Sequence, residues 1–103
     1  MKTNIEFKRY IRGDLSLKKE IWFYSDEGYK GWWLNGKYHR EDGPARMWSD
    51  GSKSWWLNGK RHREDGPAIE YWDGTKYWYL NGKYHTEEDY WKALEEYKKK
   101  NIK

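Results

Sequence analysis

The first part of the chain alternates apolar and polar side chains. The alternation runs through residues 4–11 and returns in residues 15–24, with a Gly-Asp turn signal at 13–14 between them. A period of two is typical of a β-strand with one buried face. We therefore predict that the two segments pair as an antiparallel hairpin, which forms an N-terminal cap within residues 1–27.

A repeated aromatic pattern follows in residues 28–85. A fourteen-residue segment at 32–45 recurs at 55–68, and the two copies differ only at Tyr38 and Arg61. A third, shorter copy follows, and consecutive copies are 23 residues apart. Repetition at so short a period is the sign of a repeat architecture, so we treat this stretch as the repeat region.

The first two copies each contain three turn signals: Asn-Gly, Asp-Gly-Pro and Asp-Gly. Asn-Gly and Asp-Gly favour two-residue hairpin turns, in which both central residues need positive φ. If all three signals reversed the chain, each copy would contain three strands and alternate copies would run in opposite directions. One signal must therefore be a bend within a strand. Pro44 and Pro67 cannot donate a ladder hydrogen bond. We therefore predict two strands per copy, the second of them kinked at Asp-Gly-Pro.

Side chains alternate between the two faces of a strand. Trp32 and Leu34 then share one face with their equivalents in the other copies, and we assign this face to the core. Trp33 and its equivalents Trp56 and Tyr79 lie on the opposite face.

The pattern changes to a helical one in residues 86–103. Thr86 is a candidate N-cap followed by three acidic residues, and the lysines 98–100 stand at the other end, which suits the helix dipole. Tyr90, Trp91, Leu94 and Tyr97 fall on one helical face.

The predicted fold is thus a single domain of the mainly β class. We expect a single-layer twisted antiparallel meander of about three 23-residue hairpins. An N-terminal hairpin and one C-terminal α-helix with a basic tail cap it.

Composition shows what the core is made of. Only 36% of the 103 residues are hydrophobic, against about 45–50% in typical domains, so nine Trp and ten Tyr must supply the buried area.

The absence of Cys excludes disulfides and thiolate sites. The net charge of +4 permits contact with nucleic acid or anionic surfaces. We expect no membrane span, no secretory signal and a cytoplasmic location.

The histidines His39, His62 and His85 occupy equivalent positions and raise the question of a metal site. Ligands of one zinc ion lie about 2.0–2.1 Å from it, whereas equivalent positions two strands apart are roughly 10 Å apart. We therefore predict no metal site, and expect each imidazole to bond to the turn of its own copy.

The Arg-Glu-Asp segments at 40–42 and 63–65 suggest acid–base chemistry. A catalytic site needs one unique constellation, whereas groups that recur in tandem are typical of structural positions. We expect Asp42 and Asp65 to bond to the backbone of the Gly-Pro bend. Known catalytic motifs are also missing, so we predict no catalytic residue, no cofactor and no enzyme activity.

The best candidate for a binding site is the aromatic side chains opposite the core, with nearby arginines. We predict that the partner-binding residues are Trp33, Trp56, Tyr79, Arg40, Arg61 and Arg63. Regularly spaced exposed aromatics can anchor a protein. They could instead stack bases while these arginines and Lys37, Lys60 and Lys83 meet phosphates. A third hypothesis is that the N-terminal hairpin or a second copy of the chain covers them.

The repeat unit, two aromatic residues followed by Leu-Asn-Gly-Lys-x-His, resembles the MORN repeat family. The matching positions are Trp32, Trp55, Trp78, Gly36, Gly59, Gly82, Lys37, Lys60, Lys83, His39, His62, His85, Gly51 and Gly74. The resemblance implies hairpins stacked into a long curved single sheet. The family's Gly-x-Gly after the His is replaced here by Arg-Glu-Asp-Gly-Pro-Ala. This variant looks like repeats encoded by bacteriophages and other large DNA viruses.

MORN proteins are linked to scaffolding, self-association and phospholipid contact, and some bacterial variants resemble antitoxins. The resemblance therefore implies a non-enzymatic protein–protein interaction module, encoded by a phage, that binds and inhibits or redirects a host protein such as a defence component. The alternatives are a nucleic-acid or anionic-surface binder and a homo-oligomer.

Overall fold

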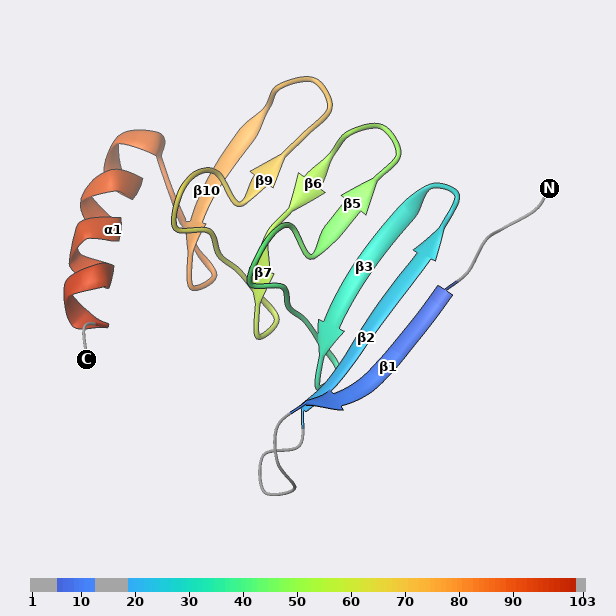
Figure 1. Cartoon of the computed structure of the whole chain (residues 1–103). Coiled ribbons are helices and arrows are strands. Elements are labelled where there is room, and N and C mark those ends of the chain that lie inside the picture. The colour runs from blue at the N-terminus through green and yellow to red at the C-terminus, as the bar shows by residue number, and fades with distance from the viewer. Residues whose placement is uncertain (1–5, 13–18, 102–103) are drawn as a thin grey trace.

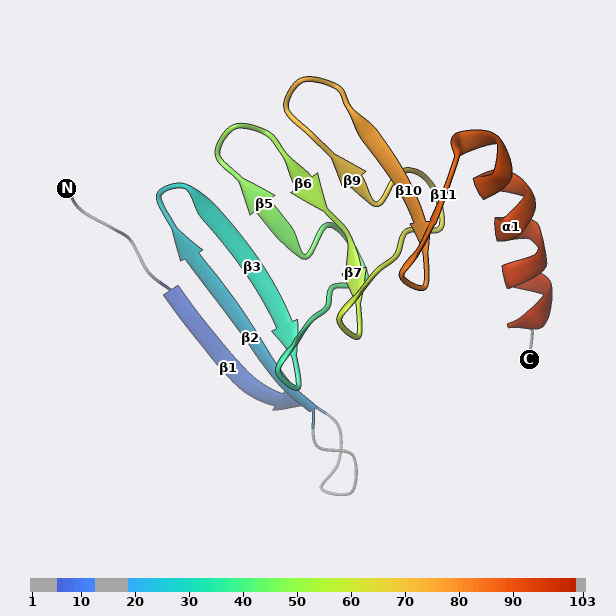
Figure 2. The same cartoon turned by 180° about the vertical axis from the view of Figure 1, so that it is seen from behind.

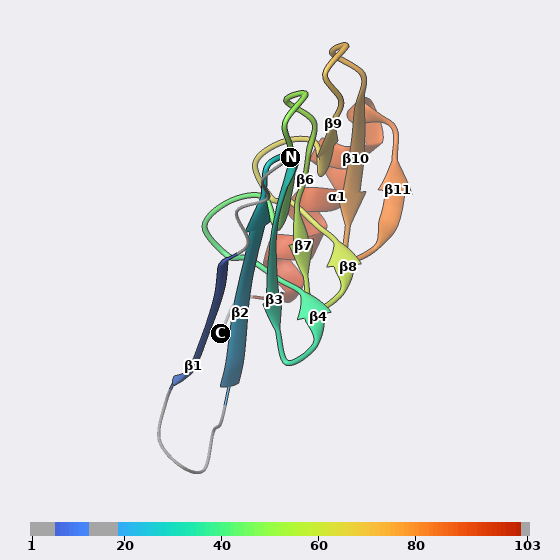
Figure 3. The same ribbon diagram turned by 90° about the vertical axis from the view of Figure 1, so that its right-hand side faces the viewer.

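Within the residues that the structure describes, the molecule is an open antiparallel sheet with a short two-stranded ladder beside it and a single helix at the C-terminal end (Figures 1 and 2). The computed structural model describes residues 6–12 and 19–101, and the side chains of Phe23 and of residues 25–101. Its principal-axis extents are 44 × 42 × 16 Å. This thickness fits one sheet with its side chains, since stacked sheets are about 10 Å apart before outer side chains are counted. Figure 3 shows the sheet nearly edge-on.

The strands follow one another across the sheet almost in chain order. Their bounds are β1 Glu6–Arg12, β2 Lys19–Asp26, β3 Tyr29–Leu34, β4 Lys37–Tyr38, β5 Arg46–Trp48, β6 Lys53–Ser54, β7 Trp56–Leu57, β8 Lys60–Arg61, β9 Ile69–Glu70, β10 Lys76–Leu80 and β11 Lys83–His85. The main sheet has the order β1-β2-β3-β5-β6-β9-β10-β11, with β4 paired to β3 and with β7–β8 as a separate ladder. The mainly β, open antiparallel meander is confirmed.

The predicted N-terminal hairpin is present. β1 and β2 pair antiparallel from Glu6 opposite Ser25 to Arg12 opposite Lys19, and β2 continues into the sheet beside β3. The predicted turn at 13–14 and the first residues of both predicted strands lie outside the described residues. Because β1 and β2 extend the sheet at its edge, they do not lie over the face of β3.

The two kinds of glycine turn differ in length. Asn35, Asn58 and Asn81 all have φ 52, and a glycine with positive φ follows each of them. These are two-residue hairpin turns, as predicted.

The Asp-Gly turns were predicted to have two residues as well, and this prediction is wrong. Trp48 N–H bonds to Ser52 O and Gly51 N–H bonds to Trp48 O, which closes a three-residue loop. Only Gly51 in this loop has positive φ. The Asp50 carboxylate accepts from the Ser52 N–H at 2.8 Å and so supports the type I turn.

The Asp-Gly-Pro segments are bends, as predicted. β3 pairs with β4 at Trp33 opposite Tyr38, and with β5 at Gly31 opposite Arg46. β4 and β5 are therefore two parts of one return strand, which leaves the sheet between them and rejoins the same partner. β8 and β9 repeat this arrangement in the second copy. The result is two strands per copy.

Helix α1, Glu87–Lys100, covers the last hairpin. Thr86 is the N-cap, and its hydroxyl accepts from Asp89 N–H. Tyr90 and Leu94 are buried against Leu80. Trp91, predicted on the same helical face, is 47% exposed. No helix in the described part of the chain is long and apolar enough to cross a membrane.

Candidate interaction face

The face of the sheet opposite α1 carries a continuous row of ring and guanidinium groups. We define the aromatic row as the side chains of Trp33, Tyr38, Trp56, Arg61, Tyr79 and Tyr84. Each Asn-Gly hairpin contributes one directly opposed pair, because a two-residue turn sets the register. The row therefore crosses β3, β4, β7, β8, β10 and β11 without a gap.

Neighbouring members of the row are in contact. Ring centroids are 4.9 Å apart for Trp33–Tyr38, 5.3 Å for Tyr38–Trp56 and 5.8 Å for Tyr79–Tyr84. The Arg61 guanidinium carbon is 5.0 Å from the Trp56 ring centre and 5.4 Å from that of Tyr79. The ring planes are tilted by 31° for Trp33–Tyr38 and 42° for Tyr38–Trp56, and Tyr79 meets Tyr84 edge-on at 68°.

Small residues beneath two of the indoles make this packing possible. A Cβ at Gly31 would lie 2.6 Å from the Trp33 ring, which no real contact allows. At the equivalent position of the second copy, Ser54 Oγ accepts from the Trp56 indole N–H at 2.7 Å. The indoles thus lie over their own strands.

A second guanidinium adjoins the row. Arg46 lies 4.6 Å from the Tyr38 ring centre and 4.8 Å from that of Trp48. Its Nε donates to the Tyr29 hydroxyl at 3.1 Å, and that hydroxyl donates to Tyr38 at 3.3 Å. Burial and the bond to Tyr38 raise the pKa of Tyr29 to about 12.

The C-terminal end of the row widens into an exposed tyrosine group. Tyr84 is 53% exposed and Tyr77, 6.2 Å away, is 38% exposed. Tyr71, 46% exposed, meets Tyr77 edge-on. These rings offer a partner more accessible area than the half-buried indoles.

The predicted binding residues divide between the two sides of the sheet. Trp33, Trp56, Tyr79 and Arg61 come together in the row. Tyr38, Tyr84 and Arg46 were missed, although counting two residues outward from each side of the Asn-Gly turn pairs Tyr38 with Trp33 and Tyr84 with Tyr79.

Arg40 and Arg63 lie apart from the row. Their guanidinium carbons are 3.9 Å from the Trp32 ring centre and 3.8 Å from that of Trp55, on the opposite side of the sheet. The prediction that they join the row's binding residues is therefore not supported by their placement. The predicted lysines also pack locally: the stems of Lys37 and Lys60 lie against the turns of the following hairpins.

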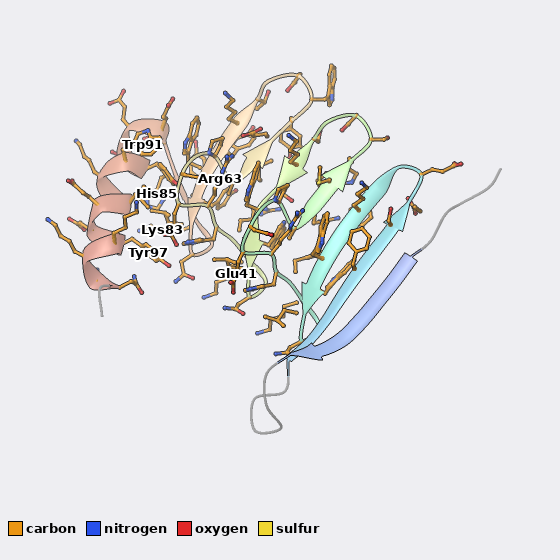
Figure 4. All side chains as sticks on the ribbon, in the orientation of Figure 1. Glu41, Arg63, Lys83, His85, Trp91 and Tyr97 are labelled. Carbon is orange, nitrogen blue, oxygen red and sulfur yellow. The ribbon has the colours of Figure 1, made fainter. Side chains whose placement is uncertain are left out.

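Arg63 closes the bend that follows it (Figure 4). Its Nε donates to Asp65 at 2.8 Å and its Nη1 donates to both Pro67 O and Glu70. Arg40 makes the equivalent bonds to its own Asp and Pro, and its hydrogen bond lowers the pKa of Asp42. The aspartates thus bond to arginine, not to the Gly-Pro backbone as predicted, because the guanidinium reaches both groups at once.

Each histidine of the first two copies bonds to the next copy. His39 Nδ1 accepts from Asn58 N–H at 3.0 Å, and His62 Nδ1 accepts from Asn81 N–H at 2.8 Å. The prediction that each imidazole bonds to its own turn is therefore wrong, because the following hairpin lies beside it. Since Nδ1 accepts, the proton is on Nε2, which donates to Glu64 in the case of His62.

The third histidine has no such neighbour. His85 Nδ1 is buried and has no hydrogen-bond partner among the described residues, because α1 stands where a further hairpin would begin (Figure 4). Across the described residues, no three His, Asp or Glu side chains are grouped closely enough to hold a metal ion.

Comparisons of the chain with protein-family models, with curated proteins and with solved structures gave no match.

Proposed function

We propose that the chain is a non-enzymatic protein–protein interaction module of MORN-like hairpins that binds its partner through the aromatic row. The main support is the unbroken row itself, which extends over three hairpins on the side of the sheet away from α1. Trp, Tyr and Arg are enriched in binding hot spots, and Tyr and Trp bury large areas at low entropic cost.

The resemblance to phage-encoded repeats extends this proposal to a biological role. We propose a small viral protein that acts in the host cytoplasm and inhibits or redirects a host protein, such as a defence component. The tandem equivalence of the Arg-Glu-Asp segments supports a role without catalysis, since both segments serve as loop clamps.

The test is capture of a host protein, identified by mass spectrometry, and its binding constant for variants of the row. Tyr84→Ala is the first variant, because a side chain that is 53% exposed contributes little to folding. We expect binding to weaken about tenfold or more, as for a hot-spot truncation of roughly 2 kcal/mol. Trp91→Ala on α1 is the matched control, since this aromatic is 47% exposed and lies off the row.

The proposal fails if Tyr84→Ala and Tyr79→Ala both bind the partner as well as the parent chain. Sedimentation velocity of the free chain tests for self-association. If the chain forms a dimer and Tyr84→Ala makes it a monomer, the row binds a second copy of the chain instead of a host protein.

A nucleic-acid binder is the second candidate function. It is favoured by the guanidinium groups on this face that have no carboxylate partner in the described part of the chain. Neither Arg46 nor Arg61 has a carboxylate partner among the described side chains. Oligothymidine binding should then weaken steeply between about 50 and 200 mM salt. Absence of binding at the lower salt concentration removes this candidate.

A further inference from the structure

The one difference between the two fourteen-residue copies lies in the aromatic row. Tyr38 and Arg61 occupy equivalent positions, and the third copy has Tyr84 there. All three side chains take the same place, opposite the aromatic residue two positions before the turn. The fold therefore accepts tyrosine at this position, and the arginine is an addition that the fold does not require.

Arg61 is held in place but not neutralised. It lies between the rings of Trp56 and Tyr79, and its Nε is buried without a hydrogen-bond partner. No carboxylate of the described residues pairs with it. Arg40 and Arg63, on the other side of the sheet, are each bonded to an aspartate at 3.0 and 2.8 Å. The guanidinium charges of Arg40 and Arg63 are thus compensated by carboxylates, whereas that of Arg61 is not compensated within the described residues.

The rings beside Arg61 hold its guanidinium by their faces. An aromatic ring carries negative charge on its faces, and the guanidinium carbon lies over the rings of Trp56 and Tyr79. This contact positions the cation but supplies no carboxylate, so the positive charge remains available to anionic oxygen atoms.

We propose that Arg61 selects the partner by binding a carboxylate, from an Asp or Glu side chain in an acidic segment of the partner protein. This inference rests on the proposed function. The terminal guanidinium nitrogens form a fork that matches a carboxylate, and a charged hydrogen bond of this type is stronger than a neutral one. Phosphates of a single strand fit less well, because bases stack on open ring faces and the Arg61 guanidinium already lies over the rings of Trp56 and Tyr79.

The test uses an array of short synthetic peptides in which each Asp- or Glu-containing peptide is paired with its Asn or Gln counterpart. The parent chain should retain acidic members about tenfold better than their amide counterparts. Arg61→Tyr should lose this preference while the fold, followed by circular dichroism, is unchanged, because tyrosine already occupies both equivalent positions. Tyr38→Arg should strengthen the preference.

The inference is overturned if the parent chain shows no acidic preference, or if Arg61→Tyr keeps it. Binding of oligothymidine that depends on Arg61, without peptide binding, would also overturn it. The proposed function is judged separately: if Tyr84→Ala loses the captured host protein and Arg61→Tyr retains it, the row binds a protein but Arg61 does not select it.

Discussion

At the scale of the residue, a few side chains decide how the aromatic row stands. Gly31 leaves room for the Trp33 indole, and a Cβ there would also lie 2.8 Å from the Tyr29 hydroxyl. Tyr29 in turn accepts from Arg46 and donates to Tyr38. Close packing makes such positions intolerant of added volume.

Tyr29 makes stability depend on alkaline pH. Its folded-state pKa of about 12 lies above the ordinary value of about 10. The folded chain therefore holds this proton more tightly, and the stabilisation is complete below about pH 10 and is lost as pH rises toward 12. Tyr90 and Tyr97 add to the same trend, since burial raises the pKa of both.

We expect the urea midpoint to fall over that range and to fall less in Tyr29→Phe, which has no proton to lose. A parallel decline in both chains would show that Tyr29 does not contribute.

At the scale of the element, hairpins are joined by bonds that recur from copy to copy. In β4, the Tyr38 carbonyl oxygen accepts a hydrogen bond from Gly59 N–H of the next hairpin. In β8, the Arg61 carbonyl oxygen accepts the equivalent bond from Gly82 N–H. The histidine acceptors reinforce this junction, with His62 only 5% exposed and its ring 5.1 Å from that of Tyr97. Adjacent hairpins therefore stabilise one another through both backbone and side chains.

His62→Ala should destabilise the chain by about 1–3 kcal/mol, because it leaves the Asn81 N–H without its acceptor in a partly buried site. His85→Ala is the internal control, since its Nδ1 has no partner among the described residues. Urea unfolding of the two variants measures the difference. Equal losses would mean that the imidazole contributes by packing alone.

At the scale of the whole molecule, a single-layer sheet has few places for a core. Among the described side chains, one buried cluster joins Leu80, Tyr90 and Leu94. Tyr90 also donates to Arg63 O and accepts from Gly66 N–H at 3.4 Å, so α1 is fastened to the second bend. The helix is thus the element that closes the open end of the sheet.

Leu94→Ala should lower the free energy of unfolding by about 2–4 kcal/mol through loss of this cluster. Glu95→Ala, at an exposed position of the same helix, should change it by less than about 0.5 kcal/mol. Chemical denaturation followed by tryptophan fluorescence reports both. A small loss for Leu94→Ala would show that the sheet is stable without its helical cap.

The sequence by itself determined the local geometry. Asn-Gly imposes positive φ at two successive residues, and proline removes a ladder donor, so hairpin turns and bends could be predicted without any distant contact. The period of the copies then fixed two strands per copy, and the polar and apolar pattern of residues 86–103 predicted the C-terminal helix.

Only the tertiary structure decided which side chains of different copies meet. Arg61 and Arg63 are two residues apart, and simple alternation puts them on one face. β8 ends at Arg61 and the chain then leaves the sheet, so Arg63 turns to Trp55 while Arg61 stays in the row. Likewise, His62 reaches the next hairpin and not its own turn. Alternation holds only while backbone bonds keep a strand in the sheet, and contacts between copies depend on how the hairpins stack.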